Sequence, residues 1–205
     1  LAELIAETSC IHNAATACMQ LEDWDFMAVY YVGIDHFGHN FMRYHPPRQE
    51  GISEDDFALY SGVMAGAYHF MDMLLSTLLK IAGDDSNVLL VSDHGFHPDH
   101  LRPPGLPNAP AGPAAEHREL GIFVAAGPDF KQGGGSIHSA SLLDVTPSLL
   151  HIYGLPVGAD MDGKVLLNAF SEERPVKTIP SWESVEGDSG CHPEDRQIDS
   201  REAEE

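Results

Sequence analysis

Residues 26–39 read Phe-Met-Ala-Val-Tyr-Tyr-Val-Gly-Ile-Asp-His-Phe-Gly-His, an apolar run that ends in side chains able to bind a metal ion. The β-branched and aromatic residues at positions 29–32 favour a β-strand. A nearly continuous apolar run is typical of a parallel strand that is covered on both faces. We therefore predict a buried strand followed by a tight loop that carries Asp35 and His39.

The same pattern recurs at residues 87–95, Asn-Val-Leu-Leu-Val-Ser-Asp-His-Gly, where a second apolar run ends in Asp93 and His94. Open α/β sheets bind their ligands at the carboxyl ends of the strands. The two Asp and His pairs are therefore predicted to meet at one edge of a sheet.

Apolar residues at helical spacing predict helices over residues 1–20, 53–82 and 144–153. Their predicted ends are Ser53 with Gly83 for the second helix and Asp144 with Gly154 for the third. The second helix would join the strands at residues 26–32 and 88–91 into a right-handed βαβ unit. With a further strand over residues 121–125, the chain is predicted to form an α/β fold, a three-layer α/β/α sandwich with a mostly parallel sheet.

Composition limits the class of protein. The chain has 205 residues, 43% of them apolar, which is enough for a folded core. A net charge of -21 argues against a nucleic-acid backbone as partner. No apolar run reaches the roughly 20 residues that a membrane helix needs, and no signal peptide is recognisable. Compartment and oligomeric state stay open.

We predict a folded part over residues 1–170 and a polar, acidic tail, extended or mobile, over residues 171–205, where Asp and Glu are concentrated. The three cysteines, Cys10, Cys18 and Cys191, show neither metal-ligand spacing nor a disulfide framework. The candidate chemistry is therefore that of histidines and carboxylates.

Two Asp and His pairs and one further histidine supply enough donors for two divalent ions. Zinc is the first choice and manganese the second. His117, just before a predicted strand, and His138, after a glycine turn, compete for the third imidazole position. Paired divalent ions suit phosphoryl transfer because they neutralise the charge that develops on the reacting oxygens. Arg43, Arg48 and Arg102 are loop cations that either meet a phosphate or face water.

Four ordered motifs resemble the alkaline phosphatase superfamily, and within it the type I phosphodiesterases and nucleotide pyrophosphatases. They are Ile34-Asp-His-Phe-Gly-His39, Val91-Ser-Asp-His-Gly-Phe96, His117 ahead of Gly121-Ile-Phe-Val-Ala-Ala-Gly-Pro128, and Leu143-Asp-Val-Thr-Pro-Ser-Leu-Leu150 with Gly154-Leu-Pro156 and Asp160-Met-Asp-Gly163. The resemblance implies an alkaline phosphatase-like fold and hydrolysis of small-molecule phosphate mono- or diesters. It also implies that Asp35, His39 and His117 bind one metal ion and that Asp93 and His94 bind the other.

The resemblance also implies a Ser or Thr nucleophile and one more Asp ligand that precede the first motif in the sequence. Neither residue can be placed in this chain. We therefore expect the chain to be the carboxyl-terminal part of a catalytic domain and to be inactive alone. The alternatives are a phosphomutase or sulfatase of the same superfamily, or a non-catalytic metal-binding or interaction domain.

Overall fold

The structure of the chain, a computed structural model, describes residues 1–103 and 112–185. These residues form two compact units that divide between Gly134 and Gly135. All of the predicted metal ligands lie in the first unit. The alternative third imidazole, His138, belongs to the second.

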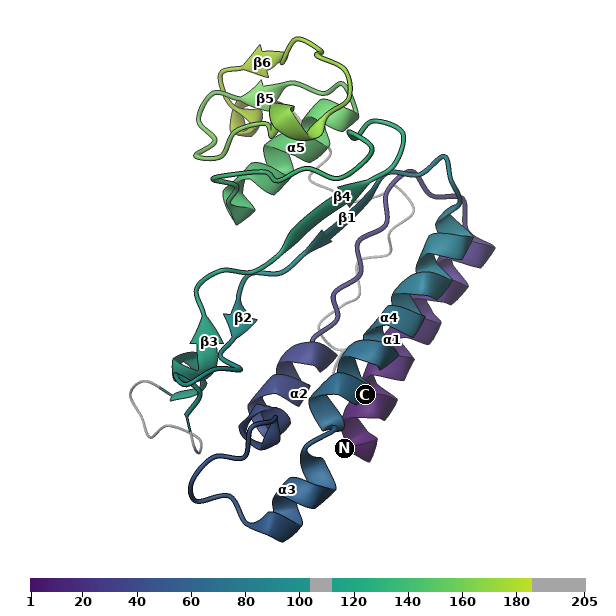
Figure 1. Ribbon diagram of the computed structural model, residues 1–205. Helices are drawn as coiled ribbons and strands as arrows, with labels where there is room; N and C mark the ends of the chain where they lie inside the picture. Colours follow the sequence, from purple (N-terminus) through teal and green to yellow (C-terminus); the bar gives the residue numbers. More distant parts are fainter. Residues whose placement is uncertain (104–111, 186–205) are drawn as a thin grey trace, which may run out of the picture. The chain divides into compact units, whose positions relative to one another are not determined.

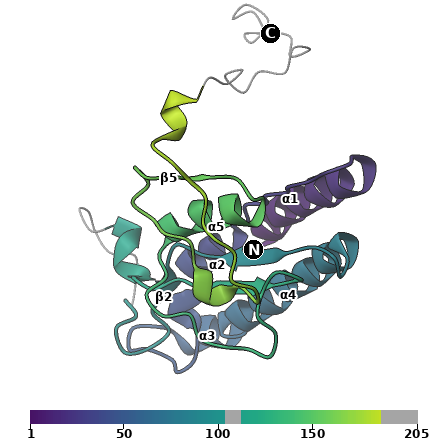
Figure 2. The same ribbon diagram turned by 90° about the horizontal axis from the view of Figure 1, so that it is seen from above.

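Three helices build the core of the first unit. The helices α1 (Ala2–Leu21) and α4 (Val63–Ala82) lie side by side, and α2 (Gly33–Phe41) packs against both (Figures 1 and 2). The predicted helix over residues 1–20 is thereby confirmed. The side chains of the buried cluster come from α2, α4 and the residue after α2; they are Phe37, Met42, Met64 and Ala67.

The predicted helix over residues 53–82 is present as two helices, α3 (Glu54–Tyr60) and α4, which are separated by Ser61 and Gly62. Its predicted ends are confirmed. Ser53 Oγ accepts a hydrogen bond from the backbone N–H of Asp56 at 3.0 Å, which satisfies one of the free donors at a helix start. Gly83 ends α4 with a positive φ of 76°, a conformation that glycine adopts without steric cost.

The strand predicted at residues 88–91 is confirmed as β1 (Val88–Val91), and the strand predicted at 121–125 is β4 (Phe123–Ala126). The two pair antiparallel, with Val88 opposite Ala126. A second antiparallel pair joins β2 (Gly95–Phe96) to β3 (His117–Arg118). This second pair brings the segment after His94 next to His117.

Two predictions for residues 26–39 are wrong. Residues 26–32 are not a strand, and among the described residues Met27–Tyr30 make no backbone hydrogen bond. Side chains still alternate between exposed and half-buried along this stretch, which is the pattern of a strand without a pairing partner. The segment with Asp35 and His39 is not a loop but lies in α2.

The described residues therefore form helices with small two-stranded sheets, an α/β arrangement without the predicted three layers or mostly parallel sheet. The predicted βαβ unit is not formed, because its first strand is unpaired and β1 has only an antiparallel neighbour. One parallel pair is present, and it lies in the second unit.

Arg102 fixes the loop after α2. This loop contains the short 3-10 helix η1 (Met42–Tyr44) and a cis peptide bond between Pro46 and Pro47. The buried guanidinium of Arg102 donates to the carbonyl oxygens of Met42, His45 and Pro47. These three bonds direct both Nη atoms of Arg102 to this loop, while its buried Nε makes no hydrogen bond, so Arg102 supports the loop.

The second unit is built around α5 (Val145–Ile152), which follows the 3-10 helix η3 (Leu142–Asp144). Asp144 precedes α5 as predicted, but its carboxylate accepts from the N–H groups of Ser141 and Lys164 rather than from α5 itself. Burial raises the pKa of this carboxyl, yet these backbone donors favour its charged form, and the net pKa lies below the ordinary value.

Part of the predicted tail is structured. β6 (Thr178–Ile179) pairs parallel with β5 (Val157–Gly158), and Trp182 Nε1 donates to the carbonyl of Pro156 at 2.9 Å. Residues 171–185 are therefore held against the second unit, and the rest of the predicted tail, with Cys191, lies outside the described residues. The remaining short 3-10 helices are η2 (Gly112–Glu116), η4 (Leu167–Ala169) and η5 (Trp182–Ser184).

Cys10 and Cys18 lie exposed on α1 with free thiols. Within the ranges that the structure describes, no helix combines the length and the apolar character that crossing a bilayer demands.

Candidate metal centre

The helix α2 places two predicted ligands one turn apart. Asp35 lies in its first turn and His39 in its last, and positions i and i+4 share one helix face. The distance from Asp35 Oδ1 to His39 Nε2 is 3.4 Å. The helix thus directs the Asp35 carboxylate and the His39 imidazole to the same point. A loop, as predicted, would not fix this arrangement.

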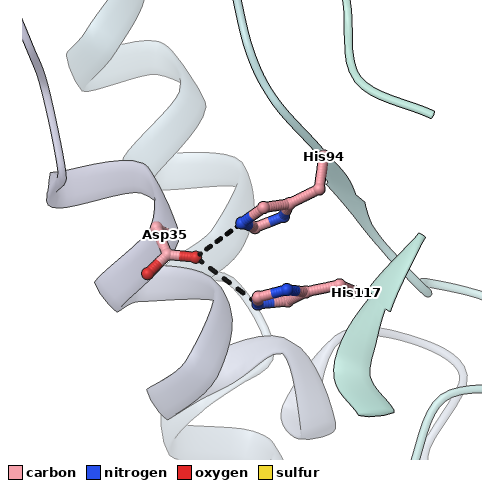
Figure 3. A group of neighbouring side chains, drawn as sticks. All are labelled: Asp35, His94 and His117. Atoms are coloured by element: carbon pink, nitrogen blue, oxygen red, sulfur yellow. Dashed lines mark ion pairs between the residues drawn. The ribbon is translucent and has the colours of Figure 1, made fainter. Parts of the chain in front are cut away.

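Two further imidazoles reach the same carboxylate from the strand segments. His94 lies between β1 and β2, and its Nε2 is 3.5 Å from Asp35 Oδ1. His117 begins β3, and its Nε2 is 3.7 Å from the same oxygen. Figure 3 shows both rings pointing at Asp35. The structure therefore brings together residues that are 82 positions apart in the sequence, from Asp35 to His117.

The central oxygen of this cluster lacks a hydrogen-bond partner. Asp35 Oδ1 is buried and accepts no hydrogen bond, although an unpaired buried carboxylate oxygen is costly. The ligand atoms of Asp35, His94 and His117 all lie within 4.8 Å of one another, as those of a metal site do. The residues present therefore fit a small divalent cation, which would satisfy the oxygen and the imidazole nitrogens together.

The imidazoles also contact one another. The rings of His94 and His117 stack with centroids 3.6 Å apart and planes at 12°, and His117 Nε2 lies 3.0 Å from His39 Nε2. Burial lowers the pKa of His117, and the nearby His94 and His39 lower it further, against a smaller opposing effect of Asp35 and Asp93. A lowered pKa keeps the imidazole neutral, which is the form that binds metals.

The Phe96 ring forms an apolar floor under the cluster. It meets His39, His94 and His117 edge to face, with centroid distances of 5.0, 5.6 and 5.1 Å respectively. On its other side it lies against Gly38 of α2, where a Cβ would come within 2.6 Å of the ring. The glycine is thus required by the close approach of Phe96 to the helix.

Replacing Gly38 with alanine tests this contact. Alanine favours a helix interior by about 1 kcal/mol over glycine, but here we expect a net loss of stability of about 1–3 kcal/mol because the Phe96 ring must move. Gly66 in α4 is the matched control, since no atom lies within 4 Å of its Cβ position. Gly66→Ala is expected to raise the melting temperature and Gly38→Ala to lower it. Equal shifts in thermal denaturation would contradict the proposed packing.

Asp93 occupies the rim of the cluster. Its side chain is 72% exposed, and its Oδ1 lies 3.8 Å from His94 Nε2 and accepts the backbone N–H of His94. His138, the alternative third imidazole, is exposed in the second unit. The loop arginines are engaged nearby: Arg43 donates to the hydroxyl of Tyr44, and Arg48 to the carbonyl of Ile52.

Sequence reasoning missed two residues of the site, Phe96 and Glu116. Glu116 is buried, and its Oε2 lies 2.6 Å from His39 Nδ1. Phe96 could have been found from the sequence, because it follows the Asp93 and His94 pair within three residues. For Glu116, the sequence showed only that it directly precedes His117. Its contact with His39 of α2 could not be predicted from the sequence.

Comparison with known proteins adds an independent finding. No solved structure matches the chain. Residues 4–101, a little under half of the chain, match the family model described as type I phosphodiesterase / nucleotide pyrophosphatase. This stretch contains Asp35, His39, Asp93 and His94, and it ends before His117. The resemblance of this chain to the type I phosphodiesterase and nucleotide pyrophosphatase family, within the alkaline phosphatase superfamily, is thereby confirmed over residues 4–101.

Proposed function

We propose that the cluster around Asp35 holds divalent metal ions for the hydrolysis of small-molecule phosphate esters, as in a phosphodiesterase or nucleotide pyrophosphatase. The observation that carries this proposal is the buried Oδ1 of Asp35, which accepts no hydrogen bond and faces three imidazole nitrogens. The description of the family that matches residues 4–101 points to the same class of reaction.

The proposed ligands form two sets. Asp35, His39 and His117 would hold one ion, and Asp93 with His94 would hold the other. Imidazole and carboxylate donors suit zinc first and manganese second. Asp35 Oδ1 and His94 Nε2, which belong to different sets, lie 3.5 Å apart, so both sets lie in one small region. Paired divalent ions are a common arrangement for phosphoryl transfer.

Bound divalent ions would polarise the phosphoryl group and neutralise the negative charge that develops on its oxygens. The residues of the chain contribute position and environment. Phe96 covers one side of the imidazoles with apolar surface. Asp93 is the most exposed of the proposed ligands, so we propose that the ester approaches from its side.

The nucleophile is left unassigned in this proposal. Among the described residues, no Ser or Thr hydroxyl hydrogen-bonds to Asp35 or to the three imidazoles of the cluster. We therefore propose that the 205 residues alone bind metal but turn over phosphate esters slowly or not at all.

The test is hydrolysis of bis(p-nitrophenyl) phosphate with zinc or manganese, assayed in the longest natural form of the polypeptide that contains these residues. We expect metal-dependent turnover that falls at least about 100-fold in Asp35→Asn. Loss of a residue that only supports a metal ligand already lowers metal affinity or activity about 10–100-fold. Asp72→Asn, an exposed acid on α4, is the control. Equal rates for wild type and Asp35→Asn would contradict the proposal.

The rival functions give different results in the same assay. Faster turnover of p-nitrophenyl sulfate than of bis(p-nitrophenyl) phosphate would favour a sulfatase. Metal binding without turnover of any of these esters would favour a non-catalytic metal-binding domain.

A further inference from the structure

Glu116 is a buried carboxylate directed at one imidazole of the metal cluster. Its side chain is only 6% exposed, and its Oε2 lies 2.6 Å from Nδ1 of His39. It ends η2, directly before His117, and its backbone carbonyl accepts the N–H of His97 at 3.0 Å. The residue is therefore anchored by its own backbone next to one proposed ligand while its side chain contacts another.

The contact selects one tautomer of His39. A carboxylate can only accept, so Nδ1 of His39 carries the proton that it donates to Glu116. In the neutral ring the lone pair is then on Nε2, which faces Asp35 Oδ1 at 3.4 Å and His117 Nε2 at 3.0 Å. This lone pair thus points to where the cation is proposed to bind.

Glu116 is not itself placed as a ligand of that cation. Its carboxylate lies at the nitrogen of His39 that faces away from Asp35, and it is absent from the group of mutually close ligand atoms formed by Asp35, His94 and His117. A carboxylate on the outer nitrogen of a metal-binding histidine instead fixes the ring orientation and makes the inner nitrogen a better donor.

We infer that Glu116 is the positioning residue of His39, holding its Nδ1–H so that Nε2 is presented to a divalent cation. This inference rests on the proposed metal site. It states that Glu116, which is not one of the proposed ligands, contributes to the metal affinity. Because Glu116 precedes His117 directly, one backbone segment supplies both a ligand and the support of a second ligand.

The first experiment measures zinc affinity of the 205-residue chain by calorimetric titration. Removal of such an outer partner lowers metal affinity about 10–100-fold, so Glu116→Ala is expected to fall in that range. Glu116→Gln, which keeps the side-chain volume and one acceptor oxygen, is expected to lie between Glu116→Ala and wild type. The matched control is Glu119→Ala, an exposed glutamate of the same segment, which should bind zinc as wild type does.

The second experiment reads the tautomer without metal. Nitrogen NMR of the imidazoles, recorded on the metal-free wild type at a pH where His39 is neutral, is expected to show the proton on Nδ1. Glu116→Ala should move the population toward the Nε2–H form, while Glu119→Ala should not. A wild-type His39 protonated on Nε2 would overturn the inference, and so would a Glu116→Gln variant with unchanged tautomer and unchanged zinc affinity.

The two proposals fail in different ways. If the wild type binds no zinc, the metal site is wrong, whatever the tautomer of His39. If the wild type binds zinc and the Glu116 variants bind it equally well, the metal site stands and the positioning role of Glu116 is wrong.

Discussion

Replacing Asp35 with asparagine is expected to lower the zinc affinity of the chain at least about 100-fold, because Asp35 offers the only buried carboxylate oxygen that faces all three imidazoles in the described residues. Loss of a residue that only supports a metal ligand lowers metal affinity about 10–100-fold. Loss of the ligand itself should lower the affinity further. Calorimetric titration with zinc measures the loss directly.

The same variant should separate metal binding from folding. At zinc concentrations of 100 times the dissociation constant, binding stabilises the wild type by about 2.7 kcal/mol, and Asp35→Asn should lose this gain. Without zinc, the variant should be no less stable than wild type, because it removes the charge of a carboxylate whose buried oxygen, Oδ1, accepts no hydrogen bond. Asp72→Asn is the control. A variant that is unstable without metal yet binds zinc normally would contradict this account.

Replacing Phe37 with alanine should have the largest effect on stability. Phe37 is 2% exposed and packs with Met42, Met64 and Ala67 at the junction of α2 and α4. Loss of a buried phenylalanine side chain costs about 3–5 kcal/mol, which is a large share of the roughly 5–15 kcal/mol that stabilises a typical domain. Urea denaturation followed by circular dichroism measures this cost.

Tyr68→Ala is the matched control for Phe37→Ala, since Tyr68 is an aromatic residue on α4 that is 58% exposed. Its loss should change stability by less than about 0.5 kcal/mol. Because α2 carries Asp35 and His39 on either side of Phe37, the core variant should also weaken zinc binding. A cost below about 1 kcal/mol for Phe37→Ala would show that α2 is not held by this cluster.

Local sequence signals predicted the elements that local interactions determine. The caps at Ser53 and Gly83 and the strand at Val88–Val91 follow from side-chain preferences within a few residues. The convergence of Asp35 with His94 was also predictable, because each follows an apolar stretch. The caps and the strand required no knowledge of which elements are neighbours. The convergence was predicted from a shared sheet edge, and the described residues bring the two side chains together without that sheet.

The failures come from contacts between distant residues. The low helix propensity of glycine at Gly33 and Gly38 predicts against a helix, yet α2 contains both residues. Packing requires glycine at both positions, because a Cβ at Gly33 would collide with Thr8 and one at Gly38 with Phe96. Tertiary packing here overrides propensity. The strand pattern of residues 26–32 is present, but a strand forms only where a second strand accepts its hydrogen bonds, and none of the described segments does so.

The most direct measurement of the metal centre is anomalous X-ray scattering at the zinc edge from crystals of the chain grown with zinc. We predict a peak within about 2.0–2.2 Å of Asp35 Oδ1 and of Nε2 atoms of the cluster, which are the usual zinc ligand distances. A fully occupied crystal with zinc only at other residues, or with His94 and His117 turned away from Asp35, would contradict the account.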